Sequence, residues 1–531
     1  MSTVEKIPNN DKPDSILVED SMERFEEHEI SDPIEDKYGG RFMWLITTAA
    51  AVGGLLFGYD LAIISGVLLM VKTDLDGHTL TSSQQELLTS ITSGGAFLGA
   101  LSAGFMLDRF GRRVAIGVGS IMFTIGSILQ ATSFSLAQMT VGRFVVGLGI
   151  GEAAMVAPIY IAEIAPAKLR GRLVTIDALA ITFGQCVANI FNIAFERVHN
   201  GWRYSVGLGA VPSLTLLLLC FMVPETTRFL IHKNRITEAT NVTAKIYIHA
   251  TPEEVERTVA NIRQQFEIEA ALLESSLRDQ LAKLYTDKAN LNALVVACGL
   301  MGIQQFAGSN TLQYYAPTLF SLVGFKNPIA VSIVVAATNF VSGLGCLRYL
   351  DVVGRRKFLI YSMWGTPVAL VVAAVAIHFV PISKDLTVES QSMTWAGIVV
   401  LVCVIAFIAF YASALGNVPW LGNELFPMEV RSLGTMMLTL TCWGSNIVVS
   451  STYLSMMKSI TPSGTFGFYA GLNFIGWICV IFAYPEVSRL SLEEIKEIFQ
   501  KGFGLPAVRY SLELQKRKKY FGRGFRKVDI P

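Results

Sequence analysis

The chain has 531 residues, of which 52% are hydrophobic and only 16% are charged, and its formal net charge is +1. This balance is too apolar for an ordinary water-soluble domain, so that class is excluded. The composition predicts an all-α protein that resides in a bilayer and has no nucleic-acid partner.

The first 41 residues are polar. They hold 12 acidic and 5 basic side chains and lack the apolar core of a signal peptide. We therefore expect residues 1–41 to form a disordered N-terminal tail.

Apolar runs of about 20 residues follow, and each is long enough to cross about 30 Å of hydrocarbon as a helix. They predict twelve transmembrane helices near residues 43–71, 86–107, 113–132, 136–162, 173–195, 203–223, 290–322, 328–350, 357–380, 395–421, 433–457 and 464–484.

The longest polar interruption between these runs divides them six and six. It predicts two six-helix bundles, residues 42–223 and 290–485, joined by a linker at 224–289 and followed by a tail at 486–531. Within the linker, residues 251–284 have the amphipathic pattern of a helix. Residues 501–531 are expected to be unstructured.

Lys and Arg are distributed asymmetrically between the two sides of such a topology. An N-terminus inside the cell places 36 of the 43 basic residues in cytosolic segments. The positive-inside rule then predicts that both termini are cytosolic. The plasma membrane is the expected location, and a monomer is the expected state.

Two charged motifs occur once in each half. DRFGRR at 108–113 corresponds to DVVGRR at 351–356, and the spacing E-x6-R recurs at 163–170 and at 424–431. Such repetition indicates an internal duplication, which is typical of secondary transporters. The acidic and basic side chains can form pairs between cytosolic helix ends, although the charges can also serve topology alone. The predicted cytosolic gate comprises Asp108, Arg112, Glu163, Arg170, Asp351, Arg355, Glu424 and Arg431.

Two charges lie inside predicted spans, Asp60 in the first and Arg143 in the fourth. Each costs at least about 2.5 to 3.5 kcal/mol at mid-membrane, so both are expected to face the bundle interior. An Asp that moves towards and away from an Arg can release and take up a proton. The alternative is a static ion pair that ties two helices together.

Amides form a second group of polar residues within the spans. An amide both donates and accepts hydrogen bonds, as does each hydroxyl of a neutral polyol. Hydrogen bonds between helices are the alternative use of such side chains. Trp420 and Trp443 offer flat rings for a sugar-like ligand, and Gly416 to Pro419 predict a break in the tenth span. The amides are Gln185, Asn189, Gln304, Gln305, Asn310, Gln313, Asn339 and Asn446.

Enzymes and ATP-driven pumps are disfavoured. The sequence contains no G-x4-G-K-[ST] phosphate loop, and its seven cysteines show no spacing typical of metal ligands or of disulfides. We expect no metal and no cofactor, with the proton as coupling ion.

The chain resembles the sugar porters of the major facilitator superfamily between about residues 43 and 500. This resemblance is carried by the GRR motifs, PETTRFL at 224–230, QQFAGSN at 304–310 and NELFPMEVR at 423–431. Three further stretches resemble the fungal myo-inositol/proton symporters, namely NGWRYSVGLGAVP at 200–212, VGFKNPIAVSIVVAATNF at 323–340 and YPEVSRLSLEEI at 484–495.

The resemblance implies alternating access to a site between the two halves. It places the proton-coupling residues at Asp60 and Arg143. Leu61, Cys442 and Thr226-Thr227 depart from the usual family residues, and Glu152 in the fourth span is also unusual. The substrate ligands that the resemblance implies are Gln185, Gln304, Gln305, Asn310, Asn339 and Trp420.

The sequence thus predicts a carrier that imports myo-inositol, or a related polyol, together with protons. A hexose transporter, either symporter or uniporter, is the nearest alternative. A nutrient sensor that binds without transporting is a more distant one. Membrane lipid is the remaining expected partner, through the basic residues 515–519 near the C-terminus.

Overall fold

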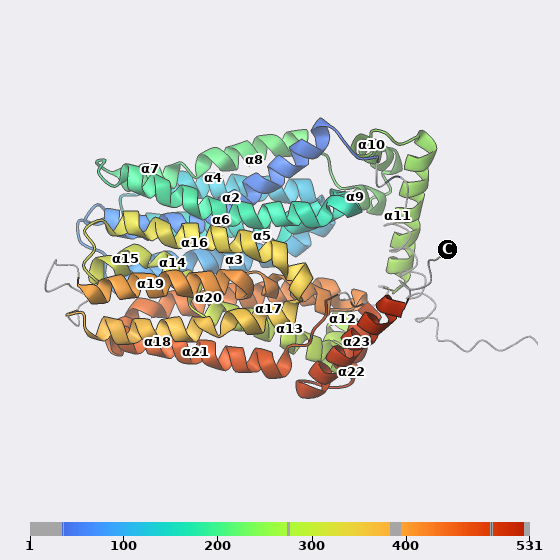
Figure 1. The fold of residues 1–531 in the computed structure, drawn as a ribbon. Coiled ribbons are helices and arrows are strands. Elements are labelled where there is room, and N and C mark those ends of the chain that lie inside the picture. Colours follow the sequence, from blue (N-terminus) through green and yellow to red (C-terminus); the bar gives the residue numbers. More distant parts are fainter. Residues whose placement is uncertain are drawn as a thin grey trace, which may run out of the picture.

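The computed structural model describes residue 34 and residues 37–272, 277–382, 394–488, 490 and 492–524. In these residues it contains twelve helices long and apolar enough to cross a membrane, which confirms the predicted number. The spans coincide with the predicted runs to within a few residues, except that the seventh ends at Tyr314 and not at 322. The helices run side by side along the long axis of the molecule (Figure 1).

The first half comprises the first six spans. The sixth span is interrupted near Leu208, so it is made of two helices. The helices are α2 (Arg41–Met70), α3 (Ser82–Phe110), α4 (Arg112–Ala131), α5 (Leu136–Ile164), α6 (Ala167–Phe195), α7 (Gly201–Gly207) and α8 (Ala210–Met222).

The second half contains the remaining six spans, and three of them are composite. Its elements are α13 (Lys288–Phe306), α14 (Ser309–Tyr314), α15 (Ala316–Leu322), α16 (Pro328–Val353), α17 (Arg355–Met363), α18 (Gly365–His378), α19 (Trp395–Phe410), the π-helical η2 (Tyr411–Leu415), the 3₁₀ segments η3 (Val418–Leu425) and η4 (Met428–Val430), α20 (Arg431–Ser459) and α21 (Thr461–Ala483).

The seventh span breaks at Gly308. This residue has φ +85°, a left-handed conformation that glycine adopts without penalty. A Cβ atom there would also lie 2.8 Å from the Tyr469 ring. The hydropathy pattern does not predict this break. The break predicted in the tenth span is confirmed, because α19 passes into a π-helical turn at Tyr411 and then into η3.

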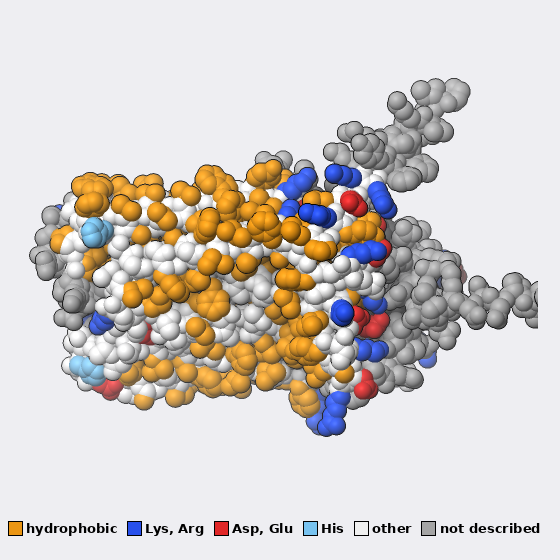
Figure 2. Space-filling model, turned by 90° about the horizontal axis from the view of Figure 1, so that it is seen from below, with side chains coloured by type: hydrophobic (Ala, Val, Ile, Leu, Met, Phe, Trp, Pro, Cys, Tyr) orange, Lys and Arg blue, Asp and Glu red, His pale blue; other side chains and the backbone are white. Residues whose placement is uncertain are grey.

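Shorter helices gather at one end of the molecule, which we call the linker side; the opposite end is the loop side (Figure 1). The helical structure predicted at 251–284 is confirmed, as two helices. Residues 273–276 between them lie outside the described part of the chain. Charged side chains flank an apolar band at the linker side (Figure 2). The linker-side helices are α9 (Thr227–His232), α10 (Ile236–Ile246), α11 (Pro252–Leu272), α12 (Leu277–Thr286), α22 (Leu492–Gln500) and α23 (Leu505–Gly524).

The expectation of an unstructured C-terminal segment is wrong for residues 505–524, which form α23. The physical reason is a small buried stripe: Ala507, Val508 and Ser511 are at most 4% exposed. Ser511 also accepts a hydrogen bond from the Glu486 amide at 3.1 Å. Residues 525–531, and residues 1–33 of the predicted N-terminal tail, lie outside the described part of the chain.

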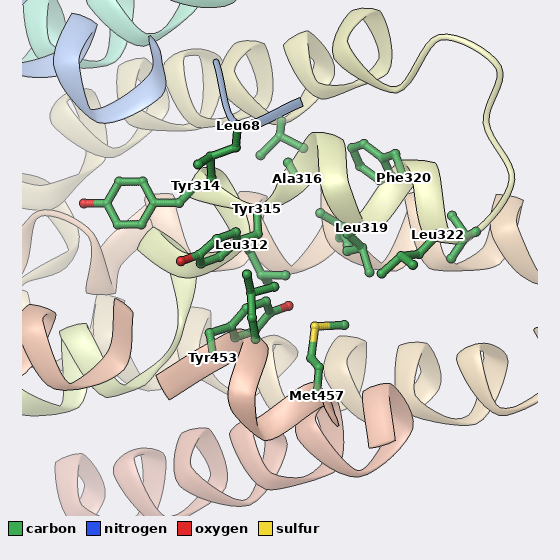
Figure 3. Close-up of a cluster of buried hydrophobic side chains, with 14 of the residues drawn as sticks. Leu68, Leu312, Tyr314, Tyr315, Ala316, Leu319, Phe320, Leu322, Tyr453 and Met457 are labelled. Carbon is green, nitrogen blue, oxygen red and sulfur yellow. The ribbon is translucent and has the colours of Figure 1, made fainter. Parts of the chain in front are cut away.

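The two halves meet along two helix pairs, α3 with α20 and α6 with α16. Towards the loop side, α14 and α15 also contact α2. A cluster of buried side chains fills this region, including Leu68 of α2, Tyr314 and Tyr315 of the broken seventh span, and Tyr453 of α20 (Figure 3). The loop side is therefore sealed by contacts between the halves.

Candidate functional site

Asp60 and Arg143, the two charges predicted within the spans, are in direct contact. The Arg143 guanidinium donates to Asp60 Oδ1 at 2.7 Å, and the two residues are 3% and 1% exposed. Arg143 Nε also donates to the Leu88 carbonyl oxygen of α3 at 3.2 Å. Close packing allows this geometry, since a Cβ on Gly147, one turn along α5, would approach the Thr92 carbonyl oxygen to 2.2 Å.

The Asp60 carboxylate is only half satisfied. Its second oxygen, Oδ2, is buried and has no hydrogen-bond partner among the described residues. A buried carboxylate oxygen normally has partners, because losing water without replacement is costly. The arrangement thus leaves one oxygen of the pair able to hold a proton while the other oxygen faces the guanidinium.

Three of the predicted substrate residues form one hydrogen-bonded cluster at the break of the seventh span. Gln305 Nε2 donates to Gln304 Oε1 at 3.3 Å, and Asn310 Nδ2 donates to Gln305 Oε1 at 2.8 Å. Gln304 Nε2 donates to the Gly416 carbonyl oxygen at 2.8 Å, which connects the seventh span to the unwound part of the tenth. The break at Gly308 turns Asn310 back towards Gln305.

The eleventh span extends this cluster through two residues of α20. Gln305 Nε2 approaches Cys442 Sγ at 3.1 Å, and Asn446 Nδ2 donates to Gln305 Oε1 at 3.0 Å. Gln305 is 4% exposed and is the centre of the cluster. Cys442, one of the departures from the family pattern, therefore lies directly against a predicted substrate residue.

Gln185 and Asn339 form a separate pair between the halves. Asn339 Nδ2 of α16 donates to Gln185 Oε1 of α6 at 2.8 Å. Closer to the loop side, one turn along α6 and two turns along α16, the Ser332 hydroxyl donates to Asn189 Oδ1 at 3.1 Å. The structure thus brings these two predicted residues together, and among the described residues neither is hydrogen-bonded to Gln305.

The two candidate tryptophans have different surroundings. Trp420 lies in η3, and 38% of its surface is exposed. Trp443 is 3% exposed and packs edge-on against Phe57 of α2, with ring centroids 5.7 Å apart. The Trp443 Nε1 atom has no hydrogen-bond partner among the described residues.

The predicted gate residues form one described ion pair in each half. Arg112 and Glu163 are 2.7 Å apart, and Arg355 and Glu424 are 3.4 Å apart. Both pairs lie on the linker side and join helices of the same half. Arg431 Nε donates to the Phe426 carbonyl oxygen at 3.4 Å. The side chains of Asp108, Arg170 and Asp351 lie outside the described residues.

Sequence reasoning missed a second pair of equivalent carboxylates. Glu225 accepts hydrogen bonds from the amides of Arg112 and Arg113 at 3.1 and 3.0 Å. In the second half, Glu486 accepts from the Arg355 amide at 3.1 Å. Each carboxylate caps the N-terminus of the third helix of its half, where a negative charge is favourable.

A sequence signal for these caps was present. PETTR at 224–228 and PEVSR at 485–489 share the pattern P-E-x-[ST]-R after the last span of each half. Burial raises the pKa of Glu225, while the amide hydrogen bonds oppose that rise. The duplication therefore extends beyond the motifs used to infer it.

A further buried carboxyl in the first half also escaped notice. Asp177 of α6 is 8% exposed, and its Oδ1 lies 2.8 Å from the position of a Cβ on Gly54. Glu152, whose role the sequence left open, is 3% exposed, and its Oε1 has no partner among the described residues. It faces Gly119 of α4 and makes no described contact with Arg143.

Comparison with known proteins places this geometry in a family. The family model described as "Sugar (and other) transporter" matches residues 46–499. The chain belongs to the sugar transporter family.

Among relatives of this transporter, a protein named myo-inositol transporter 1 from Cryptococcus neoformans is 43% identical over 490 residues, covering 91% of this chain and 85% of the relative. Myo-inositol transporter 2 of Schizosaccharomyces pombe is 39% identical, with coverage of 95% and 89%. Myo-inositol transporter 1 of Saccharomyces cerevisiae is 40% identical, with coverage of 90% and 82%.

Solved structures confirm the fold of the transporter. The inward open conformation of the xylose transporter XylE from E. coli matches with a TM-score of 0.71 at 25% identity, covering 86% of this chain and all of that one. A structure described as the major facilitator superfamily proton:xylose symporter XylE, bound to 6-bromo-6-deoxy-D-glucose, matches with a TM-score of 0.69 at 24% identity, covering 87% and 100%. The predicted arrangement of two six-helix bundles is thus confirmed.

Proposed function

We propose that this transporter imports myo-inositol together with protons by alternating access. The relatives named as myo-inositol transporters support the substrate, since they align with about nine-tenths of this chain or more. The structurally similar proton:xylose symporter XylE supports proton coupling. The observation that carries the proposal is the buried Asp60–Arg143 pair with an unpartnered carboxylate oxygen.

The amides supply the chemistry that a cyclic polyol requires. Gln304, Gln305 and Asn310 present donors and acceptors at the break of the seventh span, and Gln185 and Asn339 do so between α6 and α16. When inositol binds, its hydroxyls replace the hydrogen bonds that these amides make with one another. Trp420 supplies an aromatic face at the unwound tenth span.

Proton binding is coupled to this site through its surroundings. Tyr314 lies close enough to Asp60 and Arg143 to interact electrostatically with both charges. Its helix, α14, contacts α20, whose Asn446 donates to Gln305 at 3.0 Å. A proton on Asp60 weakens its attraction for Arg143 and frees the first and fourth spans to move. One proton crossing about 100 mV supplies about 2.3 kcal/mol and one pH unit about 1.4 kcal/mol, enough for accumulation on the order of a few hundred-fold.

The linker side is assigned to the cytosol by the positive-inside rule, which makes both termini cytosolic in the plasma membrane. Residues 42–223 and 290–485 act as the two moving bundles, with the linker at 224–289 and tails at 1–41 and 486–531.

A monomer suffices for this cycle, and anionic lipid meets the basic residues near the C-terminus. The ion pairs of the predicted cytosolic gate hold the helix ends within each bundle as the bundles separate.

Uptake of labelled myo-inositol tests the proposal in cells that lack their own carrier. Uptake is expected to be concentrative and to fall to equilibration when a protonophore collapses the gradient. Accumulation that survives the protonophore contradicts symport. Displacement of inositol by equimolar glucose identifies a hexose carrier instead, and binding without any uptake identifies a sensor.

A further inference from the structure

Three residues on one face of α3 form hydrogen bonds to the second half of the molecule. Glu86, Thr89 and Ser93 are spaced three and four residues apart, so they lie on the same side of the helix. The helix begins at a capping box, in which Thr81 and Gln84 exchange backbone and side-chain hydrogen bonds. This fixed start sets the direction in which the three polar side chains point.

Each residue has a partner on the opposite half. Glu86 accepts hydrogen bonds from the Ser455 amide at 2.7 Å and from its hydroxyl at 2.6 Å. The hydroxyls of Thr89 and Tyr315 are 2.6 Å apart. The Ser93 hydroxyl donates to Asn446 Oδ1 at 2.8 Å.

The three contacts, which we call the α3 ladder, run from the loop side towards the middle of the molecule. Glu86 lies in the second turn of α3 and Ser455 near the end of α20, whereas Ser93 and Asn446 lie deeper in both helices. Beside the middle contact, the rings of Tyr315 and Tyr453 stack with centroids 5.4 Å apart (Figure 3). Opening of the loop side must break all three contacts.

The deepest contact differs from the other two. Asn446 is 3% exposed and uses its oxygen for Ser93 and its nitrogen for Gln305. A single amide therefore joins the loop-side closure to the proposed substrate cluster.

We infer that Asn446 is a positioning residue that transmits substrate binding at Gln305 to closure of the loop side through Ser93. A polyol hydroxyl bound at Gln305 gives Asn446 Nδ2 a further hydrogen-bond acceptor. The Asn446 amide is then held in the orientation that presents Oδ1 to Ser93. Bound substrate thus favours the closed loop side. This step rests on the proposed function, because it takes the polyol to be the substrate.

Accessibility of the loop side tests the ladder. Leu322→Cys places a thiol in the sealed cluster, and labelling of intact cells by a membrane-impermeant maleimide reports opening, with the protein lacking this substitution as background. Ser93→Ala and Thr89→Ala each remove one hydroxyl from the same helix face. Both are expected to raise the labelling rate about two- to tenfold, the effect of one lost hydrogen bond. Rates equal to those of the parent protein overturn the ladder.

The response to myo-inositol tests the special role of the deepest contact. In the parent protein and in Thr89→Ala, saturating myo-inositol is expected to lower the labelling rate at least threefold. In Ser93→Ala this protection is lost, and Ser93→Thr, which keeps the hydroxyl, restores it. Equal protection in Ser93→Ala and Thr89→Ala, or its loss in both, overturns the inference.

The two proposals fail in different ways. A parent protein that takes up myo-inositol but shows no protection contradicts the link through Asn446. A parent protein that neither takes it up nor responds contradicts the proposed substrate, and the basal labelling of the two alanine variants then still decides whether the ladder seals the loop side.

Discussion

Arg143 contacts one oxygen of the Asp60 carboxylate at 2.7 Å and leaves the other oxygen buried without a hydrogen-bond partner among the described residues. A static ion pair is stabilised best when all its lone pairs are used. This pair is asymmetric, with one oxygen held by the cation and the other open to a proton. The asymmetry favours a coupling role over a purely structural one.

Asp60→Asn is expected to abolish concentrative uptake while retaining part of the exchange between equal substrate concentrations. The amide keeps the shape of the side chain but carries no titratable proton. Labelled inositol uptake and counterflow in proteoliposomes measure the two activities. Glu152→Gln is the control, since it neutralises another buried acid that has no described contact with Arg143. Full accumulation by Asp60→Asn would remove Asp60 from the coupling mechanism.

Gln305→Ala is expected to raise KM at least tenfold, equivalent to about 1.4 kcal/mol. The substitution removes the side chain that contacts Gln304, Asn310, Cys442 and Asn446. Gln313→Ala is the matched control, because that amide donates to Ser309 at 3.3 Å and has no described contact with the Gln305 cluster. Initial rates over a range of inositol concentrations give the comparison. Equal KM values for the two variants would contradict the assignment of Gln305.

Gly308→Ala is expected to abolish transport and lower the melting temperature. An alanine at φ +85° costs on the order of 1 kcal/mol, and its Cβ would collide with the Tyr469 ring at 2.8 Å. Gly299→Ala, in the same span, meets open space and is expected to leave both properties near the parent values. Thermal unfolding in detergent and uptake measure the two effects. A fully active Gly308→Ala would show that the break is dispensable.

Glu225→Ala and Glu486→Ala are each expected to destabilise the protein by about 0.5 to 2 kcal/mol, the usual cost of losing a helix cap. Both losses should be measurable, because the carboxylates cap equivalent helices, and the larger is expected at Glu225, which accepts from two helix amides where Glu486 accepts from one. Glu238→Ala is a suitable control, since its ion pair with Arg235 is more than half exposed. Thermal unfolding provides the measurement, and a loss at only one of the two caps would contradict their equivalence.

The N-terminal segment is expected to detach from the linker helices as pH falls. Lys37 donates to both carboxylate oxygens of Glu254, at 2.5 and 2.7 Å, and this contact lowers the pKa of Glu254 below 4.5. The contribution of the pair is therefore complete above pH 4.5 and is lost as pH falls through the lowered value. Protease cleavage before residue 41 should accelerate at low pH, whereas Glu254→Gln should be cleaved rapidly at neutral pH as well. Equal cleavage rates for the parent protein and Glu254→Gln at neutral pH would contradict the role of the Lys37–Glu254 pair as an anchor.

The twelve spans could be predicted because each is a long apolar run, and the Asp60–Arg143 contact followed because two opposite charges in hydrocarbon require each other. The break at Gly308 could not, since a single glycine within an apolar run leaves the hydropathy unchanged, and its positive φ and close approach to the Tyr469 ring appear only in the folded chain. The pairing of Gln185 with Asn339 depends on how the two halves approach each other. The spacing of residues along one helix gives no information about that approach. The helix at 505–524 was missed because its buried stripe is only a few small residues wide.

The two capping glutamates also bear on how the chain is made. Glu225 follows the last helix of the first half, and Glu486 follows the last helix of the second, yet each completes a helix that precedes it by more than a hundred residues. During synthesis, the third and ninth helices therefore enter the membrane with free N-terminal amides. The first is capped once the start of the linker has emerged, whereas the second waits until residue 486 has emerged. A polypeptide that stops before residue 486 would leave its second half open at that helix and be a substrate for quality control.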